Sequence, residues 1–139
     1  MYLAADLLIH PTHPDDIKRA IQFVQTRQQP IDVWYVYYGA IYQFTYYAEL
    51  YHLTGRVRTG AECGADPACY AADVAPLRGD GRVWAILSHI LIHDGVDEGV
   101  VLQNQMDRLG LRLDSYRASG ARAYLYDFSR PPKQSPHHE

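Results

Sequence analysis

Long apolar runs are missing from this sequence. A helix needs about 20 consecutive apolar residues to cross a lipid bilayer, and no segment of the chain approaches that length. The first nine residues are largely apolar, but they contain Asp6 and are not preceded by the basic residues of a signal peptide. We therefore expect the chain, as it stands, to be soluble.

A strong charge of either sign is missing too. The 13 Lys and Arg residues are offset by 16 Asp and Glu residues, and the net charge is −3. The basic residues are scattered along the chain, whereas nucleic-acid-binding proteins gather them on one face. Nucleic acid is therefore not expected as a partner.

Motifs for cofactor binding and nucleophilic catalysis are also lacking. Gly39 follows a predicted strand, but no G-x-G-x-x-G or G-x-x-x-x-G-K-[ST] phosphate loop surrounds it. The G-x-S-x-G turn that carries the catalytic serine of α/β-hydrolases does not occur. The sequence therefore predicts neither a cofactor nor a catalytic residue.

Cysteine is scarce, since only Cys63 and Cys69 occur. Two cysteines are too few for a disulfide-based scaffold, and no second pair completes a zinc site. In an oxidising compartment they would close a small ring worth about 2 kcal/mol in the chain-entropy model, whereas in a reducing one they would stay thiols. His89 and His93 are four residues apart but lie in a predicted loop, so we expect no metal site there.

What the sequence does contain is typical of one globular domain. The chain has 139 residues, 47% of them hydrophobic and 21% charged. Residues 130–139 include three prolines and two histidines, and we expect them to form a disordered tail. Residues 1–129 are predicted to form a single α/β domain.

Apolar periodicity alternates between helical and strand spacing along the chain. It predicts helices at 14–29, 41–54, 67–77 and 96–108, and strands at 33–38, 56–59, 82–87, 111–116 and 122–128. Alternating strands and helices favour right-handed crossovers and a mostly parallel sheet, here ending in an antiparallel hairpin. We expect a three-layer, Rossmann-like α/β sandwich with the first three strands in the order 2-1-3 and the hairpin beyond.

Polar residues follow two of the predicted strands. In open α/β sheets, ligands bind at the carboxyl ends of the strands, and these ends carry Tyr37, Tyr38, Gly39, Ser88 and His89. These side chains can hold a polar ligand or, through His89, perform acid–base chemistry. The simpler interpretation is that they cap the strands.

Tyrosine is the most over-used residue, with 12 copies against 3 Phe and 2 Trp. Seven of them fall in one short segment: Tyr35, Tyr37, Tyr38, Tyr42, Tyr46, Tyr47 and Tyr51. Tyrosine has an apolar body and a polar tip, which suits half-buried surfaces. We expect these rings to fill the layer between sheet and helices and to line a contact with another domain or subunit, with a sugar-stacking platform as the alternative.

Four segments of the chain resemble a known family. They are residues 14–21, 29–40, 77–89 and, taken together, 109–116 with 120–127. They are similar to the C-terminal region of bacterial membrane proteins of the dolichyl-phosphate-mannose mannosyltransferase-like (glycosyltransferase family 39-like) group. The resemblance covers residues 14–128, and it is a pattern of hydrophobic segments and dipeptides rather than a catalytic signature.

The resemblance implies that this chain is an excised domain. In such proteins a bundle of transmembrane helices precedes a soluble α/β domain on the extracytoplasmic side, and the family transfers sugars from polyprenyl-phosphate donors. Its catalytic acidic residue lies in the membrane part, so no catalytic residue is carried onto this chain. An extracytoplasmic location would also favour a Cys63–Cys69 disulfide.

The expected function is therefore that of a non-catalytic accessory domain that positions an acceptor or partner. Its expected partners are the transmembrane glycosyltransferase-like region or another subunit, and a sugar or polyprenyl-phosphate-sugar. The alternative is a stand-alone α/β protein that binds a polar small molecule or sugar at the strand ends. A hydrolase or transferase that uses His89 comes last, because no nucleophile is evident.

Overall fold

The computed structural model describes residues 14–133. The predicted helix cap at Thr12 or His13 and most of the predicted tail lie outside the described residues. The helices are α2 (Pro14–Gln25), α3 (Ile41–Leu50), α4 (Pro67–Val74) and α5 (Glu98–Leu109). The strands are β1 (Val33–Val36), β2 (Val57–Thr59), β3 (Arg82–Ser88), β4 (Ile92–His93), β5 (Val96–Asp97), β6 (Leu111–Arg117) and β7 (Ala121–Asp127).

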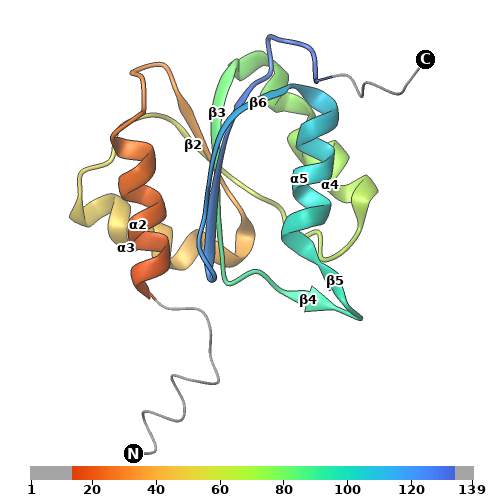
Figure 1. The fold of residues 1–139 in the computed structure, drawn as a ribbon, viewed down its shortest axis with the longest axis horizontal. Coiled ribbons are helices and arrows are strands. Elements are labelled where there is room, and N and C mark those ends of the chain that lie inside the picture. Colours follow the sequence, from red (N-terminus) through yellow and green to blue (C-terminus); the bar gives the residue numbers. More distant parts are fainter. Residues whose placement is uncertain (1–13, 134–139) are drawn as a thin grey trace, which may run out of the picture.

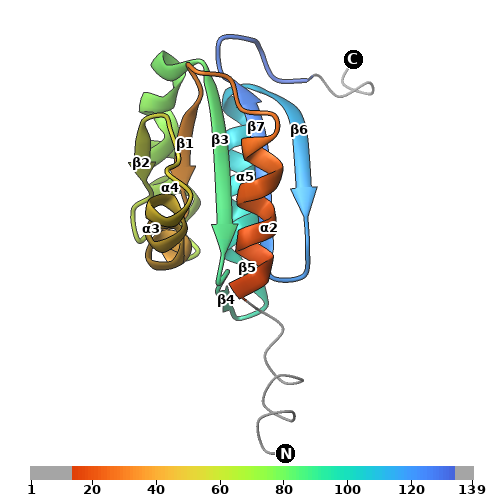
Figure 2. The same ribbon diagram turned by 90° about the vertical axis from the view of Figure 1, so that its left-hand side faces the viewer.

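Five of these strands form one sheet in the order β2-β1-β3-β7-β6. The order of the first three strands and the position of the hairpin beyond them are as predicted. Strand β1 pairs in parallel with both β2 and β3. Strand β7 runs antiparallel to its neighbours β3 and β6, so the other four strands all point the same way (Figure 2). The protein is therefore a mixed α/β fold with a mostly parallel sheet that ends in an antiparallel hairpin, as the sequence indicated.

Helices cover both faces of the sheet: α2 and α3 lie on one side, and α4 and α5 on the other (Figure 1). Side chains alternate along β1, so that Trp34 packs with α2 and α3 while Tyr35 packs with α4 and α5. Every residue of β1 is buried. Burial on both faces explains why this strand is an unbroken apolar run, since neither face needs polar side chains.

The small β4–β5 hairpin is the main element that the sequence analysis missed. It pairs Ile92 with Asp97 and His93 with Val96 around a turn at Asp94 and Gly95. Both turn residues have positive φ, at 49° and 78°, as a tight turn of this kind requires. Consequently α5 begins at Glu98, two residues later than predicted.

Other boundaries shift as well: α2 ends at Gln25 rather than at residue 29, and α4 ends at Val74 rather than at residue 77, where a 3-10 segment follows it. Strand β1 ends at Val36 because Tyr38 opens a short 3-10 turn, and α3 ends at Leu50 because His52 adopts a positive φ of 53°. No helix within residues 14–133 has the length and apolar character needed to cross a membrane.

Candidate functional site

The structure brings the predicted strand-end residues together at one edge of the sheet. The backbone N–H of Tyr37 donates to the carbonyl of Ile86 at 3.0 Å, which joins the end of β1 to β3. A Cβ atom at Gly39 would lie 2.8 Å from the carbonyl oxygen of His89 and 2.7 Å from the Tyr37 ring. Glycine therefore serves close packing of the two chain segments here rather than phosphate binding.

Ser88 and His89 do not form a catalytic pair. The Ser88 hydroxyl lies 3.5 Å from Nδ1 of His89, at the outer limit of a hydrogen bond. Ser88 is buried, whereas His89 is exposed and has a positive φ of 52°. The serine is thus closed off from a ligand, and the imidazole faces solvent beside the site.

A buried carboxylate, Glu98, is the centre of the polar cluster at this edge, and the sequence analysis missed it. Its side chain has no exposed surface. The hydroxyls of Tyr37 and Tyr38 both donate to Oε1, at 2.6 and 2.7 Å. Oε2 lies 2.6 Å from Nε2 of His93, whose side chain is 55% exposed, although this contact lacks the alignment of a good hydrogen bond.

The two tyrosines remain protonated hydrogen-bond donors. Burial first, and then the hydrogen bond to Glu98, raises the pKa of Tyr38 to about 12. The same causes raise the pKa of Tyr37 further, although its hydrogen bond from the Leu91 backbone N–H opposes the shift. Because both phenols stay neutral, they shield the Glu98 carboxylate without adding charge.

The start of α5 places Glu98 in this position. Asp97 caps the helix by accepting a hydrogen bond from the Val100 N–H at 3.0 Å, which makes Glu98 the first helical residue. A carboxylate in a first turn interacts favourably with the helix dipole. In the sequence, Glu98 therefore has the pattern of an ordinary helix start, and nothing there indicates burial.

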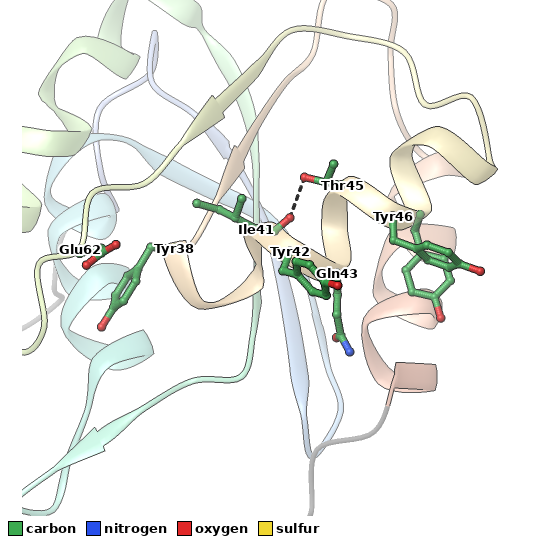
Figure 3. Close-up of a pocket in the computed structure, with 8 residues that line it drawn as sticks. Tyr38, Ile41, Tyr42, Gln43, Thr45, Tyr46 and Glu62 are labelled. Carbon is green, nitrogen blue, oxygen red and sulfur yellow. Dashed lines mark hydrogen bonds between the residues drawn. The ribbon is translucent and has the colours of Figure 1, made fainter.

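An open groove lies beside this cluster, with a volume of about 800 Å³. It is lined by Tyr38, Ile41, Tyr42, Gln43, Thr45, Tyr46, Tyr47 and Glu62. Figure 3 shows Tyr38 and Glu62 at one end and Tyr46 at the other, with Tyr42 and Gln43 between them. Tyr38 belongs to both features, since its ring borders the groove while its hydroxyl binds Glu98.

The tyrosine-rich segment thus divides into two groups. Tyr35 and Tyr37 fill the core as expected, but Tyr42 and Tyr46 are 89% and 61% exposed. Tyr42 and Tyr46 are four residues apart on α3, so they follow one face of the helix about 6 Å apart. Tyr38, in the 3-10 turn before α3, lines the same groove. The three rings form a row on the surface. We call the groove that they line, together with its other lining residues, the tyrosine groove.

The loop that carries Glu62 is closed by a covalent bond. In the structure Cys63 and Cys69 form a disulfide, with their Cα atoms 5.4 Å apart. The Tyr70 hydroxyl also donates to the Gly64 carbonyl at 2.7 Å. The loop is therefore held at two points next to the end of the groove.

Within residues 14–133, no three His, Cys, Asp or Glu side chains gather as metal ligands. Comparisons of the chain with protein-family models, with curated proteins and with solved structures found no match. Its function is therefore inferred from its own residues.

Proposed function

We propose that this protein is a non-catalytic recognition domain that binds a saccharide along the tyrosine groove. It would do so as the extracytoplasmic accessory domain of a glycosyltransferase family 39-like membrane protein, where it presents an acceptor. The observation that carries the proposal is the row formed by Tyr38, Tyr42 and Tyr46 in a groove at the carboxyl end of the sheet.

The composition of the groove suits a sugar. A pyranose has apolar C–H faces and a polar rim of hydroxyls, and an exposed tyrosine offers a ring face together with a hydroxyl. Gln43 and Glu62 add hydrogen-bonding groups to the lining. The volume of about 800 Å³ falls within the usual range of ligand sites.

The buried cluster supports a role in positioning rather than in catalysis. Tyr37, Tyr38 and His93 enclose the carboxylate of Glu98, so a ligand in the groove would reach it only by displacing the Tyr38 ring. The Tyr38–Glu98 hydrogen bond instead fixes the ring that ends the groove. Glu98 is therefore a positioning residue in this proposal.

Two further observations support the membrane-associated setting. The Cys63–Cys69 disulfide favours an oxidising compartment. The β4–β5 hairpin exposes Ile92 and Val96, next to the exposed Leu91, which provides an apolar surface for the transmembrane region or another subunit. Helices on both faces of the sheet also favour the Rossmann-like sandwich, which stays a prediction.

Titration calorimetry with a panel of neutral tetrasaccharides tests saccharide binding. We expect the double variant Tyr42→Ala, Tyr46→Ala to bind its best ligand at least about tenfold more weakly, because two stacking faces are lost. Tyr42→Phe with Tyr46→Phe keeps the rings and should keep most of the affinity. His89→Ala, at the same edge but outside the groove, should bind like the wild type.

Two outcomes would contradict the proposal. If no saccharide binds the wild type, the domain does not recognise sugars and the groove serves a protein contact. If a saccharide binds but the double alanine variant is unaffected, the ligand site lies elsewhere on the surface.

A further inference from the structure

The described lining of the tyrosine groove carries charge of one sign. Among residues 14–133, Glu62 is the only charged side chain that lines the groove, and no Arg or Lys does. At the other end, Glu49 shares a neighbouring hollow with Tyr46 and is the only charged residue of α3. The groove thus runs between two carboxylates.

Glu62 is exposed and makes no ion pair with any residue in the described range 14–133. Its charge still acts on the groove. After burial and the Glu98 hydrogen bond, it is a smaller cause of the raised pKa of Tyr38. Glu62 therefore places a carboxylate next to Tyr38 at one end of the groove (Figure 3).

Glu98 is a second carboxyl group behind the wall that Tyr38 forms. It has no Arg or Lys partner among the described residues, and the imidazole of His93 is charged only when protonated. The Arg122 guanidinium lies close to the start of α5, but it pairs with Asp97 rather than with Glu98. Glu62 is therefore the charged side chain that lines the groove at the Tyr38 end.

From this charge pattern we infer that the groove selects saccharides that carry protonated amino groups over neutral and acidic ones. This inference rests on the proposed saccharide binding and states which chemical class of saccharide the groove prefers. An ammonium group at the Glu62 end gains an ion pair with the carboxylate and a cation–π contact with the Tyr38 or Tyr42 ring. A phosphate or uronate in the same place is repelled, so the phosphate of a polyprenyl donor has to lie outside this groove.

Three tetrasaccharides provide the test: a glucosamine tetramer, its N-acetylated form, which differs only at the amino group, and a uronic acid tetramer of similar length. Calorimetry at low salt should show the amino form binding about fivefold more tightly than the acetylated one. The uronate should bind most weakly. The preference for the amine should shrink as salt is added, because the site is open to solvent.

Glu62→Gln is the decisive variant. It should reduce the amine preference to within about twofold, because the affinity for the amino form should fall more than the affinity for the acetylated form. Asp114→Asn, which removes an exposed carboxylate of β6 outside the groove, should keep the full preference.

The outcomes separate the two proposals. If the acetylated tetramer binds as tightly as the amino form, or if the preference survives Glu62→Gln, the selectivity is wrong while saccharide binding stands. Tighter binding of the uronate would also overturn the selectivity. If none of the three binds, the proposed function fails and the selectivity fails with it.

Discussion

At the scale of single residues, the buried carboxyl groups of Asp32 and Glu98 differ in their hydrogen-bond partners. Asp32, just before β1, receives two hydrogen bonds from the Arg82 guanidinium at 2.7 and 3.0 Å and one from the Trp84 indole at 3.0 Å. Its charge is therefore compensated by a permanent cation. Glu98, at the opposite end of the sheet, is held by neutral phenols and an exposed imidazole.

This difference supports a structural role for Asp32 and a ligand-related role for the Glu98 cluster. A buried charge with a guanidinium partner joins two strands and leaves little net field outside. Glu98 instead accepts hydrogen bonds from Tyr37 and Tyr38, and the Tyr38 ring lines the tyrosine groove.

Tyr37→Phe tests the hydrogen bonding of Glu98. The variant removes a buried donor 2.6 Å from the carboxylate, so the free energy of unfolding should fall by about 1–3 kcal/mol. Urea denaturation followed by circular dichroism measures the change. Tyr42→Phe, at an 89% exposed ring, should change stability by less than about 0.5 kcal/mol. Equal stability of the two variants would mean that the carboxylate does not depend on the Tyr37 hydroxyl.

At the scale of elements, the start of α5 connects the helix to the sheet. Asp97 caps the helix through Val100 and also accepts two hydrogen bonds from Arg122 of β7, at 3.1 and 2.7 Å. Gly99 permits this approach, because a Cβ there would lie 2.6 Å from the Arg122 guanidinium. The same turn therefore sets the helix against the sheet and aims Glu98 into the site.

The Asp97–Arg122 pair predicts a dependence of stability on acid pH. Hydrogen bonding to Arg122 lowers the pKa of Asp97 below its usual value, although partial burial opposes the shift. Since the folded-state pKa lies below the unfolded value of about 4, the stabilisation is complete above about pH 4 and is lost as the pH falls through the folded-state pKa.

Asp97→Asn isolates this effect, because asparagine still caps a helix but cannot form the ion pair. We expect the variant to be less stable than the wild type by about 1–3 kcal/mol at pH 7, with a smaller loss of stability between about pH 5 and pH 2. Denaturant titrations across that range measure both effects. An unchanged acid profile would assign the acid sensitivity to other carboxylates, such as Asp80 and Asp127, whose pKa values are also lowered by their hydrogen-bond partners.

At the scale of the whole molecule, one sheet separates two apolar cores, and its two ends differ in chemistry. The amino-terminal ends of β1 and β3 are joined by the Asp32–Arg82 pair. The carboxyl-terminal ends carry the Glu98 cluster, the tyrosine groove and, next to them, the disulfide loop. The Asp32–Arg82 pair thus lies at the end of the sheet opposite the proposed site, whereas the Asp97–Arg122 pair lies beside Glu98.

Because of the disulfide, the stability of the fold depends on whether its compartment is oxidising or reducing. Replacing Cys63 and Cys69 together by alanine should lower the free energy of unfolding by about 2 kcal/mol, because the unfolded chain regains the freedom of the closed loop. A thiol reductant should lower the stability of the wild type by a similar amount and leave the double variant unchanged. Two titratable thiols in the native, unreduced protein would show that the bond is not formed, and would remove its support for an extracytoplasmic location.

The sequence by itself determined the mixed α/β class of fold and the order of the first three strands. Apolar periodicity identified β1, β3 and the β6–β7 hairpin, and crossover rules gave the order 2-1-3 with the hairpin beyond. It also placed Tyr37, Tyr38 and Gly39 at the edge where the groove lies. Local patterns suffice for these features because such features depend on residues that are neighbours in the sequence and on packing rules that hold for all sheets.

Only the tertiary structure decided which residues form the site. Glu98 meets Tyr37 and Tyr38 across about 60 positions of sequence, and no local pattern distinguishes a buried acidic residue at a helix start from a solvated one. The exposure of Tyr42 and Tyr46 was equally hidden, since a tyrosine suits a core and a surface alike. Burial and charge compensation arise from contacts between distant segments, and they exist only once the chain has folded.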